Sequence, residues 1–176
     1  MTLLSFFLII HALLGAFDVV CNHEIIARLP RLAYWKEEAL HSAREAAFTL
    51  LFLSMAWFEW RGSYSWFIGI VLIAELLITI YDTIIEVDTR ILPVTERIAH
   101  VFLLINFGIV VALAFPTLIA WSGLPSEIAF VDQGIASWLL TLFACGAGLW
   151  CIRDGVSAIQ LKRRQQTEGY VILHPH

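Results

Sequence analysis

Long, mostly apolar segments constrain this chain more than any other feature of its sequence. Each has about 20 residues or more, the length at which a helix crosses the hydrocarbon core of a bilayer. Short stretches such as "RLPR" and "RILP" separate them. The predicted helices cover 3–28, 32–60, 66–89, 94–121 and 135–156. Since a bilayer offers no water to the backbone, we expect an all-α integral membrane helical bundle, a four-helix core plus a fifth transmembrane helix.

The composition agrees with several membrane spans packed together. Of the 176 residues, 60% are hydrophobic and 15% are charged, and the mean hydropathy is +0.80, which is too apolar for an ordinary soluble domain. The first apolar segment lacks the basic flank and cleavage site of a signal peptide, so we expect it to remain as a span. These features predict one domain over 1–164, a cytoplasmic tail over 165–176, and no nucleic-acid partner.

The basic residues predict the orientation. Five spans place the first connection, the third connection and the C-terminal segment on the same side of the membrane, and nearly all basic residues at helix ends fall on that side. Arg61 lies on the opposite side. By the positive-inside rule the side with most of the basic residues is cytoplasmic, which places the N-terminus outside the inner (plasma) membrane. The basic residues on the predicted cytoplasmic side are Arg28, Arg31, Lys36, Arg90, Arg97, Arg153, Lys162, Arg163 and Arg164.

Ionisable residues within the first four predicted helices need an explanation, because a charge at the centre of a bilayer costs about 2.5–3.5 kcal/mol even on lenient scales. Counting from the cytoplasmic turns at about 1.5 Å per residue places many of them at a common level. This layer comprises, helix by helix, Asp18, Asn22, His23 and Glu24; Glu37, Glu38 and His41; Asp82 and Glu86; and Glu96 and His100.

The spacing of these residues is typical of metal ligands. Three pairs are three or four residues apart and therefore share a helix face. They are Glu38 with His41, Asp82 with Glu86, and Glu96 with His100. The first helix contributes either Asp18 or the pair His23 and Glu24, because Asp18 and His23 lie about 140° apart on a regular α-helix.

Oxygen and imidazole ligands without thiolates favour iron, manganese or zinc. The three cysteines have no C-x-x-C spacing, which argues against a thiolate zinc site. Many carboxylates with several histidines suit two metal ions, which would offset the cost of burying the acids. We therefore expect two bound ions, with iron preferred and manganese or zinc as alternatives.

A second group of polar residues lies deeper in the predicted bundle. His11, Glu45 and Glu75 are expected to orient the metal-binding imidazoles or to form steps of a proton path, or else to be polar contacts between helices. Arg44 and Arg97 lie close to the layer, where each pairs with a surplus carboxylate or holds an anionic group of a substrate.

The ligand order resembles that of di-iron carboxylate four-helix bundles, including ferritin-like proteins and the membrane-associated alternative oxidases. An acid on the first helix is followed by Glu38-x-x-His41, an acid on the third helix, and Glu96 with His100. The last pair has three intervening residues where that family has two. The chain also has a general likeness to small bacterial multi-span membrane proteins. The resemblance implies a di-iron centre held by these residues.

Single residues also have simpler explanations. Glu24, Glu37 and Asp88 lie near the predicted membrane boundary, where acids face water or pair with basic residues. Glu96 lies at a helix start, where an acid complements the helix dipole. We prefer the metal site because four helices place such residues at the same depth.

These features predict a membrane-embedded oxidoreductase with a dinuclear, preferably di-iron, centre. It would act with O₂ as a hydroxylase, desaturase or oxidase on a lipophilic substrate that arrives through the membrane lipid, with electrons from a cytosolic donor. The alternative is a small metal-ion or proton-coupled transporter, because buried ionisable residues also mark ion pathways. A third reading is a non-catalytic assembly subunit whose acids pair with arginines of a partner.

Overall fold

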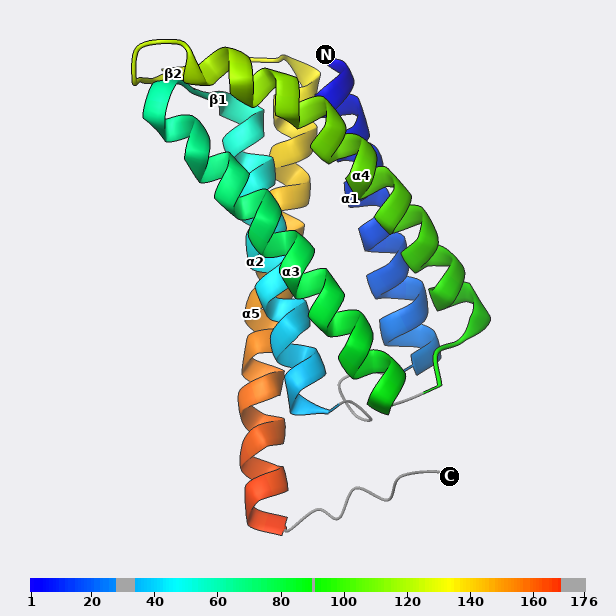
Figure 1. Ribbon diagram of the computed structural model, residues 1–176. Helices are drawn as coiled ribbons and strands as arrows, with labels where there is room; N and C mark the ends of the chain where they lie inside the picture. The colour runs from blue at the N-terminus through cyan, green and yellow to red at the C-terminus, as the bar shows by residue number, and fades with distance from the viewer. Residues whose placement is uncertain (28–33, 90, 169–176) are drawn as a thin grey trace.

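Five long helices run up and down in the computed structural model, which describes residues 1–27, 34–89 and 91–168 (Figure 1). Helix α1 (Leu3–Phe17) continues as a π-helix, η1 (Asp18–Ala27). The others are α2 (Trp35–Trp57), α3 (Ser65–Thr89), α4 (Val94–Ser122) and α5 (Ile135–Glu168). The predicted helical bundle is confirmed, although α5 continues into the segment predicted as a tail. Positions 28, 31 and 90, whose arginines support the predicted orientation, and residues 169–176 of the tail lie outside the described residues.

Four helical segments within the described residues are long and apolar enough to cross a membrane: Leu3–Ile26, Gly62–Thr89, Val94–Ser122 and Ile135–Thr167. The prediction had five spans, and the helix that fails this criterion is α2. It carries several charged residues along its first half, including Glu37, Glu38, Arg44 and Glu45. A helix with these charged residues can be accommodated in the bundle because it packs along both α5 and α3.

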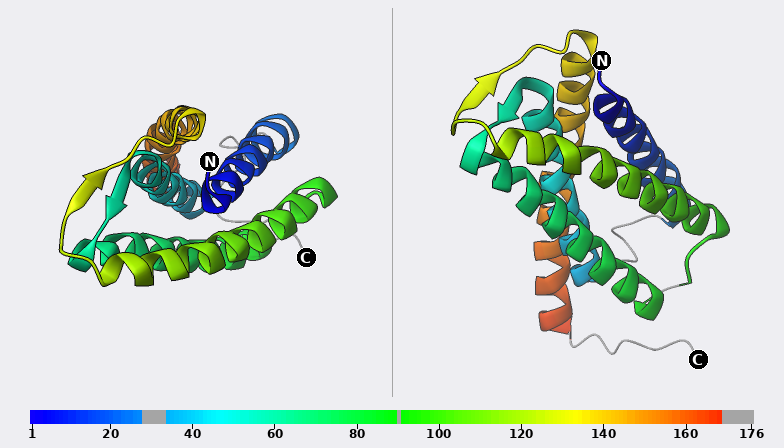
Figure 2. Two further views of the ribbon diagram at one scale, coloured as in Figure 1. Left: turned by 90° about the horizontal axis from the view of Figure 1, so that it is seen from above. Right: turned by 45° about the horizontal axis from the view of Figure 1, so that its top comes forward.

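The bundle has two sides when it is viewed down its length (Figure 2). Helices α3 and α4 form one side, and α5, α2 and α1 form the other. The main helix pairs are α2 with α5, α2 with α3, and α1 with α4. The outward faces carry large apolar side chains, such as Ile73 and Leu77 of α3 and Phe102 and Ile105 of α4, all more than half exposed. Apolar outward faces of this extent are typical of helices surrounded by lipid.

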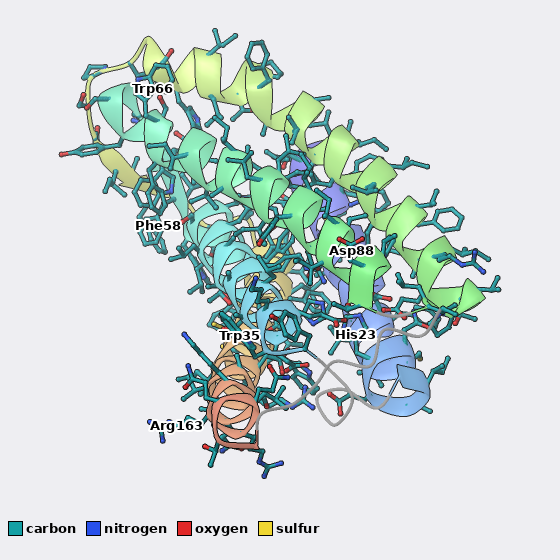
Figure 3. The ribbon with its side chains drawn as sticks, turned by 60° about the horizontal axis from the view of Figure 1, so that its bottom comes forward. His23, Trp35, Phe58, Trp66, Asp88 and Arg163 are labelled. Atoms are coloured by element: carbon teal, nitrogen blue, oxygen red, sulfur yellow. The ribbon has the colours of Figure 1, made fainter. Side chains whose placement is uncertain are left out.

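The interior divides along the bundle into an apolar half and a polar half. Near the N-terminus the buried side chains are apolar and include Leu8, Leu51, Ile68, Val110 and Leu140. At the end where η1 and α3 finish and α2 and α4 begin, the buried side chains are instead acids and histidines. Figure 3 shows His23, Trp35 and Asp88 at this end, away from Phe58 and Trp66.

A short antiparallel strand pair closes the opposite end. Strands β1 (Phe58–Trp60) and β2 (Ile128–Phe130) pair with Glu59 opposite Ala129. The 3-10 turn η2 (Gly62–Tyr64) follows β1. The sequence predicted only helices and connections here. Strand β1 follows α2 and strand β2 precedes α5, so the two segments run side by side at this end of the bundle (Figure 1). The ring of Trp57, at the end of α2, stacks on the ring of Phe130 in β2.

Candidate metal centre

The π-helix η1 places two potential ligands of the first helix on the same side. Asp18 is 1% exposed and His23 is 4% exposed. Because π-helical hydrogen bonds join residues five apart, residues i and i+5 lie on one side of the helix. The Nε2 atom of His23 is 3.6 Å from Oδ2 of Asp18. A regular α-helix would turn either Asp18 or His23 toward the interior, whereas this π-helix turns both toward it.

Helix α2 brings Glu37 and His41 into the same interior. Both are buried, at 0% and 3% exposure. They are four residues apart, as Glu96 and His100 are on α4, and such pairs share a helix face. The imidazole of His41 stacks on that of His23, with ring centres 4.6 Å apart. The two helices thus present their histidines to one another across the bundle.

Helices α3 and α4 supply ligands through the regular period of their buried faces. On α3 the buried face passes from Ile68 and Leu72 to Glu75, Asp82 and Glu86, so one stripe turns from apolar to acidic. On α4 the buried face includes Ala99, Phe107 and Val110 and begins with Glu96. On each helix the face that is turned toward the bundle interior is therefore apolar at one end and acidic at the other.

Two groups of these residues bring their ligand atoms close enough together for a metal ion. The first group is His23, Glu86, Glu96 and His100, and the second is Glu37, His41 and Glu86. Within each group the ligand atoms all lie within 4.8 Å of one another. Glu86 belongs to both groups, so the two candidate sites are adjacent.

The two carboxylate oxygens of Glu86 face different histidines. Oε1 lies 3.5 Å from Nε2 of His41, and Oε2 lies 3.6 Å from Nδ1 of His100. A carboxylate that directs one oxygen to each of two ligand groups has the arrangement of a bridging ligand.

The distances between histidine nitrogens and carboxylate oxygens fit ligands of a common ion. They range from 3.3 to 3.6 Å. Two ligand atoms about 2.1 Å from one ion, at angles between about 90° and 110°, are separated by roughly 3.0–3.4 Å. Within the described residues the buried Nε2 atoms of His23, His41 and His100 make no hydrogen bond. Each of these nitrogens instead has a carboxylate oxygen 3.3–3.6 Å away, and an ion between the two would bind both.

Two aspartates flank the two groups. Oδ2 of Asp18 lies 3.3 Å from Nε2 of His100, and Oδ1 accepts a 2.7 Å hydrogen bond from the amide of Asn22. On the other side, Oδ2 of Asp82 lies 3.4 Å from Nε2 of His41 and 3.1 Å from Nη1 of Arg44. Each aspartate thus adjoins a histidine and is held by a neighbouring polar side chain.

Three residues predicted at this layer lie elsewhere. Glu38 is buried, but within the described residues it belongs to neither ligand group and instead lies within electrostatic range of Asp154 and Arg153 on α5. Glu24 forms an ion pair with Arg153. Arg97 is exposed on α4. Adjacent residues on a helix point about 100° apart, so Glu37 faces the cluster and Glu38 faces α5.

In the deeper group His11 and Glu75 are buried and Glu45 is half-buried. Nδ1 of His11 lies 3.2 Å from the amide nitrogen of Asn106, and its ring stacks on Phe48. Glu75 accepts a 2.8 Å hydrogen bond from Thr79. His11, Glu45 and Glu75 line a cavity of about 230 Å³ that also reaches His23, His41, Glu86 and His100. The cavity connects the ligand groups to the apolar half of the bundle.

Glu37 is the site residue that the sequence analysis placed in the layer but not among the expected ligands. A signal was present, because Glu37 precedes His41 by four residues just as Glu96 precedes His100. The comparison with Glu-x-x-His motifs favoured Glu38 instead. The repeated four-residue spacing within the chain was the better guide.

Comparisons with known proteins give no relative from which a function could be transferred: neither a family model nor a curated protein nor a solved structure matches the chain. Its distinguishing feature is a cluster of histidines and carboxylates that could hold a metal ion, set among helices apolar enough to cross a membrane.

Proposed function

We propose that the chain is a membrane-embedded oxidoreductase with a dinuclear metal centre, preferably di-iron, that acts with O₂ on a lipophilic substrate as a hydroxylase, desaturase or oxidase. The observation that carries the proposal is the position of Glu86. It is shared by two groups of ligand atoms, and its two oxygens face His41 and His100. A shared carboxylate of this kind holds two cations close together.

The density of carboxylates in the cluster favours divalent cations. Among the described residues its carboxylates are those of Asp18, Glu37, Asp82, Glu86 and Glu96, and the guanidinium of Arg44 contacts Asp82. Divalent ions bound among these carboxylates would offset part of the cost of burying them inside an apolar bundle.

Each residue of the cluster has a definite part in this proposal. His23, Glu96 and His100 would hold one ion, Glu37 and His41 the other, and Glu86 both. Asn22 and Arg44 would fix the positions of Asp18 and Asp82, as residues around metal sites commonly do. When bound, the ions would supply the electron transfer to O₂ that side chains lack. Oxygen and nitrogen ligands without thiolates are consistent with iron or manganese.

The location favours a lipophilic substrate. The cavity beside the cluster is lined by Phe48, Phe52 and Phe107 and extends into the apolar half of the bundle. A molecule dissolved in lipid could reach the cluster without passing through water. The same aromatic wall would keep bulk water from the reacting atoms. A cytosolic donor would supply electrons at the end of the bundle where the cluster lies.

Elemental analysis of the purified protein tests the metal centre. A tag without histidine is needed, because His174 and His176 already add imidazoles to the C-terminal end. We expect about two ions per chain, and we expect Glu86→Ala to lose both because it serves both groups. Glu59→Gln, which removes a carboxylate at the far end of the bundle, should keep both. The proposal fails if the protein neither carries metal nor takes up iron, manganese or zinc on reconstitution.

A second candidate function is a metal-ion or proton-coupled carrier. It is favoured by the continuation of polar residues beyond the cluster, since Glu45, Glu75 and His11 line the same cavity. Uptake of metal or protons into proteoliposomes would support the carrier. Metal-dependent O₂ consumption without uptake would support the oxidoreductase.

A further inference from the structure

The cavity beside the cluster contains a polar tier that the proposed metal ligands do not use. Helix α2 lines the cavity from one end to the other with His41, Arg44, Glu45, Phe48 and Phe52. His41, Glu45, Phe48 and Phe52 are separated by three or four positions and form one stripe along the helix, with Arg44 beside it. The stripe passes from a ligand, through a charged residue, to aromatic rings.

The cavity has room for a small amphiphile. Its whole volume, polar and apolar parts together, is about 230 Å³, compared with the roughly 150 Å³ of an engineered apolar cavity that binds benzene. Gly15 of α1 and Gly146 of α5 line it, and a Cβ atom added at either would meet no atom within 4 Å. The aromatic rings of Phe52, Phe107 and Phe143 complete the wall.

Three polar atoms of the cavity wall have no hydrogen-bond partner among the described residues. They are Oε2 of Glu45, Oε2 of Glu75 and Nε1 of Trp150. Glu75 is only 3% exposed, and burying a polar atom without a hydrogen-bond partner is unfavourable. A bound molecule that completes these hydrogen bonds would remove that cost.

The chemistry of the three atoms indicates what they recognise. The carboxylate oxygens accept hydrogen bonds, whereas an indole N–H only donates. A hydroxyl group can donate to a glutamate and accept from the tryptophan. An amine cannot accept a hydrogen bond in its charged form, and a carboxylate cannot donate one to Glu45 or Glu75. A hydroxyl therefore satisfies both kinds of partner.

We propose that this cavity binds a hydroxyl-bearing amphiphile, with its hydroxyl in the polar part of the wall, where Glu45, Glu75 and Trp150 have atoms unpartnered in the described part of the chain, and its apolar part against the phenylalanine rings. Exposed residues at the cavity edge, Ala16 of α1 and Val20 of η1, make an apolar route of access from the side of the bundle. The inference that the bound amphiphile is the substrate rests on the proposed function. Binding of the amphiphile in this cavity can be measured without turnover.

Quenching of tryptophan fluorescence tests the site, because Trp150 lies in its wall. The probe is 11-bromo-1-undecanol, added to the protein in lipid nanodiscs. We expect saturable quenching that Trp150→Phe removes, although six other tryptophans remain. The acid of equal length, 11-bromoundecanoic acid, and 1-bromoundecane should bind at least tenfold more weakly, because each loses hydrogen bonds in a buried site.

Two variants and one control sharpen the test. Glu75→Leu removes an acceptor and should weaken the alcohol about tenfold. Gly146→Leu fills the open space and should abolish saturable quenching at unchanged metal content. Glu59→Gln, a carboxylate outside the cavity, should bind as the unsubstituted protein does.

The proposal is overturned if the three probes bind equally or if Gly146→Leu leaves the quenching unchanged. Metal content and O₂ consumption are measured on the same preparations. Saturable alcohol binding in a protein without metal would refute the proposed function alone. A metal-loaded protein that consumes O₂ but does not discriminate the alcohol would refute this inference alone.

Discussion

Two neighbouring glutamates at the start of α2 differ in surroundings despite equal burial. Glu37 and Glu38 are 0% and 1% exposed, yet Glu37 belongs to a ligand group with His41 whereas Glu38 lies near the charges of α5. The difference arises from the angle of about 100° between consecutive helical residues. Burial alone therefore does not identify a ligand at this site.

Exchanging each of these glutamates in turn separates their roles. Glu37→Gln should lose one of the two proposed ions, because an amide is a weaker ligand than a carboxylate. Glu38→Gln is the matched control and should keep both. Elemental analysis of the two purified variants checks this. Equal metal loss in both variants would remove Glu37 from the site as described.

The amide of Asn22 should matter through Asp18. Asn22 is 0% exposed and donates a 2.7 Å hydrogen bond to Asp18. Asn22→Leu removes that bond at similar volume, and we expect metal affinity to fall about 10–100-fold, as for other residues that orient ligands. The same exchange at Asn106, which contacts His11, should leave affinity unchanged. Competition with a metal chelator measures both, and equal affinities in the two variants would contradict this role.

At the scale of elements, the change of helix type within the first span has the largest consequence for the site. Helix α1 is regular through Phe17 and becomes the π-helix η1 at Asp18. The change begins at the first residue that faces the cluster. π-helical turns are rare and often occur at functional sites. Here the π-helix places two polar groups on one side of the first span. On α2, α3 and α4 the regular α-helical spacing of three or four residues does the same.

The turn after β1 requires glycine at position 62. Gly62 has φ +58°, and a Cβ there would overlap the backbone of Ser126. Gly62→Ala should destabilise the fold by at least about 1–2 kcal/mol, the cost of a left-handed conformation. The matched control is Gly69→Ala, where a Cβ meets nothing within 4 Å. Thermal unfolding in detergent should show Tm lowered by about 2–4 °C per kcal/mol for Gly62→Ala only.

At the scale of the whole molecule, the segregation of polar and apolar interiors fits a chain that lies in a membrane with its cluster near one surface. The outward faces are apolar over most of α3 and α4. Helix α2, which is not apolar enough to count as a membrane span, packs against both α5 and α3. The exposed end of α5 carries Lys162, which lies 4.7 Å from the ring of Trp35. These features are consistent with the expected cytoplasmic position of that end.

Cysteine labelling checks the orientation. The native cysteines Cys21, Cys145 and Cys151 are first replaced by alanine. A membrane-impermeant thiol reagent should then label Ser122→Cys in intact cells and Gln166→Cys only after permeabilisation, since the positive-inside rule places the end of α5 in the cytoplasm. The reverse pattern would invert the orientation.

Much of the architecture could be predicted because it follows from local properties. The length of the apolar segments determines five helices and their approximate bounds, and the three- and four-residue spacings determine which polar residues share a face. Burial of Asp82, Glu86, Glu96 and His41 follows from those two facts. The di-iron resemblance and the reaction stay predictions, because they concern bound groups and chemistry.

What only the tertiary structure decided depends on the rotation of each helix about its own axis. The sequence left open whether Asp18 or His23 faces inward and preferred Glu38 to Glu37. The π-helical turn and the packing of α2 against α5 set those rotations. The strand pair at the far end likewise needs two segments some 70 residues apart to meet. Helix formation depends on neighbours in sequence, whereas helix rotation depends on contacts with residues far away along the chain.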